Sequence, residues 1–165
     1  MERIRIKHEF EPVYDKNSRI LILGSLPSVK SREQSFYYGH PQNRFWRVIS
    51  SLCKSPLPET TEDKKLLLLS NRIAVWDVIA ECDISGSSDA SIRNVTPTQL
   101  SLILDNADIR RIFLNGSKAF DIYERWQKPI TGREAVKLPS TSPANAAWSF
   151  EKLLKAWSVI LDDLK

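Results

Sequence analysis

The sequence contains few side chains that bind metals or form disulfides. It has two cysteines, Cys53 and Cys82, and two histidines, His8 and His40. Two thiols are too few for a disulfide framework or a four-thiolate cluster. A structural zinc site would need all four of these side chains at once. We therefore expect neither a bound metal nor a metal cluster.

Long apolar runs and several common motifs are also missing. No apolar run reaches the ~18 residues that a membrane span needs, and the opening MERIRIKHEF lacks the apolar core of a signal peptide. We expect an intracellular protein without a membrane anchor. The sequence has no G-x-G-x-x-G, no P-loop lysine motif and no G-x-S-x-G elbow. These absences argue against a dinucleotide-binding domain and against a serine hydrolase.

The composition that remains is that of a globular protein. The chain has 165 residues, of which 42% are hydrophobic and 27% are charged, so we expect one domain spanning residues 1–165 with a single sizeable core. The formal net charge is +4 and the pI is about 9.1. This mild basic excess is compatible with a nucleic-acid partner but does not require one.

The pattern of apolar residues predicts alternating strands and helices. Four β-rich runs cover residues 19–24, 72–79, 110–115 and 135–139, and the first, RILILG, is apolar on both faces, as in a central parallel strand. Helical patterns cover residues 43–52, 96–105 and 117–126, and a last helix runs from 143 or 146 to 164. The second of these helices opens with a capping box of Thr96 and Gln99, with Pro97 at its first position.

This alternation predicts an α/β fold, a three-layer α/β/α sandwich around a central four-stranded parallel sheet. In such sheets, ligands bind beyond the carboxyl ends of the strands. Three loops at those ends contain residues suited to chemistry. They are GSLPS (residues 24–28), the aromatic and amide-rich YYGHPQNRFW (37–46), and LPSTSPANA (138–146).

Each loop also has a purely structural interpretation. Residues 24–28 can be a tight turn required by packing, and residues 138–146 can be a helix cap followed by proline. Asn43 can be the N-cap of the helix that follows it. We expect Phe45 and Trp46 to belong to the core stripe of that helix.

Taken together, the three loops resemble motifs of the uracil-DNA glycosylase superfamily. Its mismatch-specific branch has G-x-N-P-G, F-x-H-P-x-N-R-F-W and N-P-S-x-L-S. In this sequence Leu26 stands where that branch keeps its catalytic asparagine. This departure is similar to the hypoxanthine-DNA (deoxyinosine) glycosylase family, which relies on the asparagine of H-P-Q-N. The resemblance extends from about residue 19 to residue 146.

The resemblance implies a role for each motif residue. Asn43 would be catalytic and would orient or activate the attacking water at the sugar C1′, with its carbonyl fixing the water in line. The flipped base would stack on Tyr38, and Asn115 would bind its edge. The remaining substrate-binding residues would be Gly24, Ser25, Leu26, Pro27, Ser28, His40 and Ser140, and the DNA-binding residues would be Arg44, Ser142, Pro143, Ala144 and Asn145.

These roles describe a monofunctional DNA glycosylase that removes hypoxanthine from DNA in base excision repair. It would flip the damaged nucleotide out of the duplex, need no cofactor, and act as a monomer on the nucleoid DNA of a prokaryotic cytoplasm. Two alternatives remain open: a glycosylase of the same fold acting on uracil, xanthine or mismatches, and a catalytically silent DNA-binding module. Asp77 and His40 are further candidates for assisting catalysis, and phosphate contacts are open to Lys30, Arg32, Arg44, Arg47, Lys118 and Arg133.

Overall fold

The computed structural model describes residues 3–8, 10–26, 36–85 and 91–164. Its centre is a parallel sheet of strands β2 (Ile20–Gly24), β3 (Ile73–Asp77), β6 (Arg111–Asn115) and β7 (Ala135–Leu138). The strand order is β3-β2-β6-β7, and every neighbouring pair is parallel. The predicted four-stranded parallel sheet is therefore confirmed.

The central strand β2 shows why this sheet is covered on both sides. All five of its residues are buried. Successive side chains of a strand point to opposite faces, and accordingly Ile20 and Ile22 belong to one hydrophobic cluster while Leu21 and Leu23 belong to another. An apolar strand of this kind requires a packed layer on each face.

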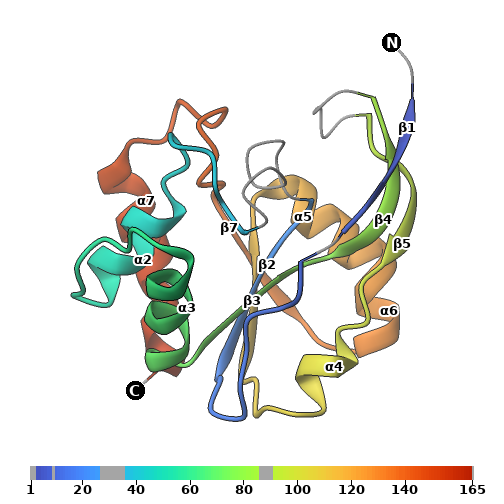
Figure 1. Ribbon diagram of the computed structural model, residues 1–165. Coiled ribbons are helices and arrows are strands. Elements are labelled where there is room, and N and C mark those ends of the chain that lie inside the picture. Colours follow the sequence, from blue (N-terminus) through green and yellow to red (C-terminus); the bar gives the residue numbers. More distant parts are fainter. Residues whose placement is uncertain (1–2, 9, 27–35, 86–90, 165) are drawn as a thin grey trace.

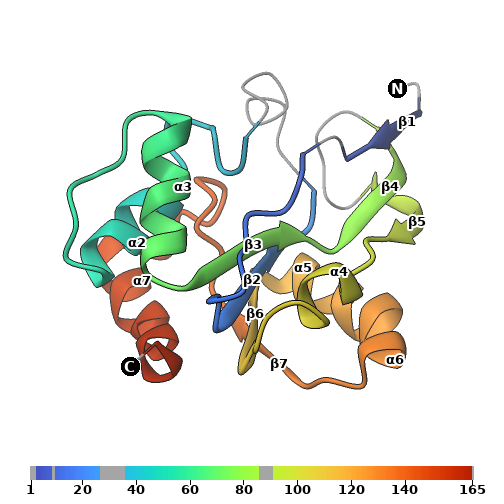
Figure 2. The same ribbon diagram turned by 60° about the horizontal axis from the view of Figure 1, so that its bottom comes forward.

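Helices supply those two layers, as Figures 1 and 2 show. One cluster contains buried residues of α2 (Phe45–Leu52), α3 (Thr61–Ser70) and α7 (Phe150–Trp157), which continues as the 3-10 helix η3 (Ser158–Asp163). The opposite cluster contains residues of α4 (Ser101–Leu104), α5 (Ser117–Ile122) and the π-helix η2 (Tyr123–Gln127), which leads into α6 (Lys128–Thr131). The three-layer sandwich is confirmed.

A second sheet was not predicted. It is antiparallel, in the order β1-β4-β5, and consists of β1 (Ile4–Lys7), β4 (Ile79–Ile84) and β5 (Arg93–Pro97). The chain passes from the parallel sheet into this one at Val78, whose N–H donates to the Gly24 carbonyl at 2.8 Å and whose carbonyl accepts from the Thr98 N–H at 3.1 Å. The strand expected over residues 72–79 is therefore divided between two sheets.

Two predicted helix starts are wrong. Thr96 and Pro97 do not open a helix but lie in β5, opposite Glu81 and Ile79 of β4, and α4 begins only at Ser101. Proline is tolerated there because β5 is an edge strand. The last helix begins at Phe150, where the Ser149 side chain accepts from the Lys152 N–H. The pairing of Thr96 and Pro97 with β4 is tertiary and has no signal in the local pattern, whereas the start of the last helix is set by the local Ser149 cap.

Candidate active site

The carboxyl ends of the parallel strands bring the predicted loops together. Gly24, the last residue of β2, is paired with Asp77, the last residue of β3. Asn115 ends β6 and is paired with Leu138, which ends β7 and leads into the loop of residues 139–149. The ends of four strands that are distant in sequence therefore share one edge of the sheet.

A chain of three polar side chains spans this edge. The Thr141 hydroxyl donates to Asn43 Oδ1 at 2.8 Å, and Asn115 Nδ2 donates to the same hydroxyl at 3.0 Å. The Thr141 backbone N–H donates to Asn115 Oδ1 at 3.0 Å. Thr141 is fully buried, whereas Asn43 and Asn115 are half-buried. The structure thus joins the predicted catalytic and base-binding asparagines through one residue.

Thr141 is a site residue that the sequence interpretation missed. It lies in the loop assigned to DNA contact, between Ser140 and Ser142, and shares their small polar character. Only its burial distinguishes it from them. The sequence signal for this residue is weak, because a hydroxyl residue in a proline-bracketed loop has no period or motif that indicates which way it points.

Asn43 also has a local structural role. Its Oδ1 accepts from the Phe45 N–H at 2.9 Å, an Asx-type turn at the start of α2. The helix-start interpretation and the catalytic one are therefore compatible. Phe45 and Trp46 are both buried in the core, as expected.

Tyr38 is held in an unusual conformation beside this network. Its φ is +53°, in the left-handed region that non-glycine residues rarely adopt. One face of its ring stacks on Phe45, with centroids 4.0 Å apart and an interplanar angle of 19°. Its hydroxyl is buried and forms no hydrogen bond that meets normal geometry with the described residues. Burial, reinforced by the Asp77 charge, raises the pKa of this phenol well above its usual range.

Gly24 lies against Asp77 and Tyr38. A Cβ placed on Gly24 would lie 2.6 Å from Asp77 Oδ1 and 3.0 Å from the Tyr38 hydroxyl. The other carboxylate oxygen of Asp77 is 2.7 Å from His8 Nε2. The Phe10 N–H donates to His8 Nδ1 at 3.2 Å, so Nε2 carries the proton that points at Asp77. Asp77 is thus a buried carboxylate behind the strand end, oriented by a histidine.

Arg44 is engaged within the protein. Its guanidinium donates to the carbonyls of Ser142 and Asn145, each at 3.1 Å, and to that of Trp148. Its backbone N–H donates to the Thr141 carbonyl at 3.0 Å. These contacts hold the 139–149 loop against the start of α2. These hydrogen bonds indicate that Arg44 positions the loop, and its predicted contact with a DNA phosphate stays a prediction.

Hydrogen bonds between its own residues fix the conformation of the 139–149 loop. Ser140 Oγ accepts from the Ser142 N–H at 3.1 Å, and Ser142 Oγ accepts from the Ala144 N–H at 3.2 Å. Asn145 Nδ2 donates to the Ser140 carbonyl at 3.0 Å. Ala144 is exposed and Pro143 half-buried. The outer side of the loop borders an open pocket of about 520 Å³, lined by Ser117, Lys137, Leu138, Pro139, Ser140, Ser142, Ala144, Asn145 and Trp148.

The remaining predicted site residues either shape the loops around this network or lie outside the described residues. His40 is half-buried, and its Nδ1 accepts from the Gln42 N–H at 3.0 Å, which shapes the loop. Ser25 and Leu26 are half-buried at the end of β2, where Leu26 packs against the core. The predicted base-pocket residues Pro27 and Ser28, and the candidate phosphate contacts Lys30 and Arg32, lie outside the described residues.

Among the described residues, no group of three or more histidine, cysteine, aspartate or glutamate side chains is arranged to hold a metal ion. Within that same part of the chain, no helix has the length and apolar character needed to cross a bilayer.

The fold and site define an α/β protein with an amide- and hydroxyl-lined site at the carboxyl edge of its parallel sheet. The family model of the uracil DNA glycosylase superfamily matches residues 11–165, and the chain belongs to that superfamily. Similar proteins named hypoxanthine DNA glycosylase are found in Methanosarcina acetivorans, with 39% identity over 87% of this chain and 91% of the relative, and in Methanosarcina barkeri, with 37% identity over 84% and 88%.

A solved structure agrees with this assignment. The solution NMR structure of a protein from Methanosarcina acetivorans, provisionally described as a uracil DNA glycosylase, is 35% identical. It superposes with a TM-score of 0.79 over 94% of this chain and 96% of that one. The resemblance inferred from the three loops is therefore confirmed at the level of the superfamily.

Proposed function

We propose that this protein is a monofunctional DNA glycosylase that removes hypoxanthine from DNA. The observation that carries the proposal is the hydrogen-bonded chain of Asn43, Thr141 and Asn115 at the carboxyl edge of the sheet. The curated relatives named hypoxanthine DNA glycosylase support the same choice of base. Asn43 is the catalytic residue in this proposal, and Thr141 and Asn115 support it.

The reaction replaces the bond between the sugar C1′ and N9 of the base. The oxygen of water bonds to C1′, and the C1′–N9 electron pair leaves with the purine. The proton lost by the water passes to solvent, and the purine anion takes a proton from solvent. Positive charge grows on the sugar and negative charge on the base, so the DNA phosphates stabilise one partner and hydrogen-bond donors the other.

Donors at the end of β2 and the face of Tyr38 form the base pocket. The N–H groups of Ser25 and Leu26 make no hydrogen bond with another described residue. Hypoxanthine presents a carbonyl where adenine has an amine, so a donor-rich pocket accepts the first and leaves buried groups unpaired with the second. One face of Tyr38 already stacks on Phe45, and the flipped base stacks on the opposite face.

DNA binding is assigned to the 139–149 loop and the pocket beside it. Hydroxyl and amide groups line this pocket together with Lys137, a combination suited to a phosphodiester. In this proposal Ser142, Pro143, Ala144 and Asn145 contact the backbone around the flipped nucleotide. The protein acts as a monomer on chromosomal DNA in the cytoplasm.

Base release from end-labelled duplexes tests the activity. Each duplex carries a single deoxyinosine, deoxyuridine, deoxyxanthosine or normal adenine, and is treated with protein and then with hot alkali. We expect strand breaks only after alkali, strongest at deoxyinosine and absent at adenine. The Asn43→Ala variant should be slower by roughly 100-fold or more. Asn106→Ala is the matched control, because among the described residues that exposed amide donates only to the Leu102 carbonyl on α4, and its activity should equal the wild type.

The other outcomes separate the alternatives. Breaks chiefly at deoxyuridine would keep the site and reject the choice of hypoxanthine. Breaks without alkali would indicate a lysine nucleophile and reject a monofunctional enzyme. Tight binding with no base released from any duplex would leave a DNA-binding module and reject catalysis.

A further inference from the structure

Building on the proposed function, we propose that Asn43 acts as a hydrogen-bond donor through its Nδ2 amide, and that Thr141 is the positioning residue that holds it so. The family resemblance implied the opposite role, in which the Asn43 carbonyl oxygen fixes the attacking water. The contacts of the Asn43 carboxamide decide between the two.

Backbone donors fix which end of each amide is oxygen. The Phe45 N–H can only donate, so the Asn43 atom 2.9 Å away is Oδ1 and not the amide nitrogen. The Thr141 N–H likewise fixes Asn115 Oδ1 at 3.0 Å. Neither asparagine can be flipped without placing two donors face to face.

The direction of the Thr141 hydroxyl follows from these two assignments. Because Asn115 is fixed, its Nδ2 is the group 3.0 Å from Thr141 Oγ1 and donates to it. The hydroxyl proton is then free to donate in turn, and it points at Asn43 Oδ1, 2.8 Å away. Polarity therefore runs in one direction, from Asn115 through Thr141 to Asn43.

Asn43 Oδ1 thus accepts two hydrogen bonds, one from Phe45 and one from Thr141. A carbonyl oxygen has two lone pairs, so this oxygen has no acceptor position left for a water. The Asn43 Nδ2 group forms no hydrogen bond among the described residues, and the side chain is half-buried at the site. Asn43 can therefore act through its Nδ2 group as a neutral hydrogen-bond donor. Such a donor stabilises the purine most strongly as negative charge develops on the leaving base.

An Asn43→Asp variant separates the donor role from the carbonyl role. Its Oδ1 keeps the Phe45 and Thr141 contacts, while its other oxygen is a donor when protonated and an acceptor when ionised. We expect single-turnover cleavage of a deoxyinosine duplex to be about 100-fold slower than wild type near neutral pH. The rate should rise as the pH falls through the range in which carboxyl groups protonate. A rate equal to wild type near neutral pH, or one that rises with pH, would overturn the donor role.

Thr141 is tested by Thr141→Val, which keeps the shape and removes the hydroxyl, and by Thr141→Ser, which restores it. We expect Thr141→Val to lower the single-turnover rate about 10-fold, to leave duplex binding within about 2-fold, and to be largely rescued by serine. Thr60→Val is the control, because the Thr60 hydroxyl caps α3 away from the site, and its rate should be unchanged.

A failure of the positioning role can be distinguished from a failure of the proposed glycosylase function. If the wild type releases no base, the proposed function fails and no variant needs interpretation. If the wild type is active and Thr141→Val cleaves at the same rate, the positioning role is wrong. The role is also wrong if Thr141→Ser and Thr141→Val are equally slow while both variants keep the melting midpoint of the wild type.

Discussion

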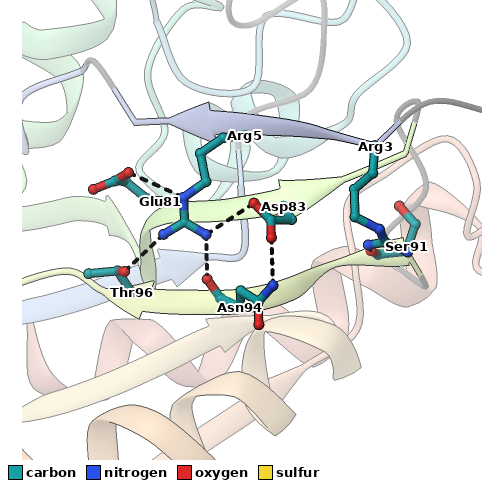
Figure 3. Close-up of polar contacts among 7 residues, drawn as sticks. All are labelled: Arg3, Arg5, Glu81, Asp83, Ser91, Asn94 and Thr96. Carbon is teal, nitrogen blue, oxygen red and sulfur yellow. Dashed lines mark hydrogen bonds and ion pairs between the residues drawn. The ribbon is translucent and has the colours of Figure 1, made fainter.

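Two polar contacts from the N-terminal segment to the continuous stretch of β3 and β4 differ in burial: the hydrogen bond of His8 to Asp77 and the ion pair of Arg5 with Asp83. The side chains of His8 and Asp77 are 3% and 4% exposed. Those of Arg5 and Asp83, three and six residues away in sequence, are 41% and 23% exposed. Figure 3 shows Arg5 on the open face of the antiparallel sheet, surrounded by Glu81, Asp83, Asn94 and Thr96.

The number of hydrogen bonds does not indicate which of these two pairs contributes more to the free energy of unfolding. Arg5 makes four side-chain hydrogen bonds and His8 bonds to Asp77 once. Water competes for the Arg5 cluster and screens it. Asp77 is shielded from water, so loss of its partner leaves a buried charge without compensation. The inner pair is also the one that reaches the site, through the contact of Asp77 with Gly24.

The strongest test of this comparison removes the inner partner. We expect His8→Ala to lower the free energy of unfolding by about 3 kcal/mol, because the buried Asp77 carboxylate loses its hydrogen-bond donor, and the melting midpoint by roughly 10 °C. Urea and thermal unfolding followed by circular dichroism measure both. His40→Ala is the matched histidine control, since His40 is half-buried in a loop, and it should change stability far less. Equal losses for the two variants would remove the distinction.

A second, smaller effect is expected from Gly24→Ala. The new methyl group would lie 2.6 Å from Asp77 Oδ1, and Asp77 cannot move freely because His8 holds it. We expect a loss of about 1–3 kcal/mol, typical of overpacking, together with slower base release.

Gly132→Ala provides the comparison for this glycine. Gly132 has φ +67°, and a Cβ placed on it would meet nothing within 4 Å, so the cost of the substitution is confined to backbone strain. The variant should lose stability with unchanged activity. If Gly24→Ala keeps full activity, the close packing of Gly24 against Asp77 and Tyr38 is not needed for base release.

A difference in burial also explains which elements could be predicted from the sequence and which could not. Parallel strands such as β2 are predictable because burial on both faces makes them continuous apolar runs. β1 has the sequence IRIK and an exposed pattern, and its pairing with β4 has no local signature. Asn43, Tyr38 and Asn115 were assigned to the site through motif resemblance. Thr141 and His8 were missed as site residues because their roles arise from partners about 70 to 100 positions away.

The smallest effect is expected from Arg5→Ala, which should leave the melting midpoint within about 2 °C of the wild type at neutral pH. The pKa of Asp83 lies below its usual value because the Asn94 amide and then the Arg5 guanidinium hydrogen-bond to its carboxylate. A lowered native pKa means that any stabilisation is present above the ordinary pKa of 3.8 and is lost as the pH falls through the native value. The small difference between Arg5→Ala and wild type should therefore vanish in acid. If it grows there instead, or exceeds the His8→Ala effect at neutral pH, burial is not what separates the two pairs.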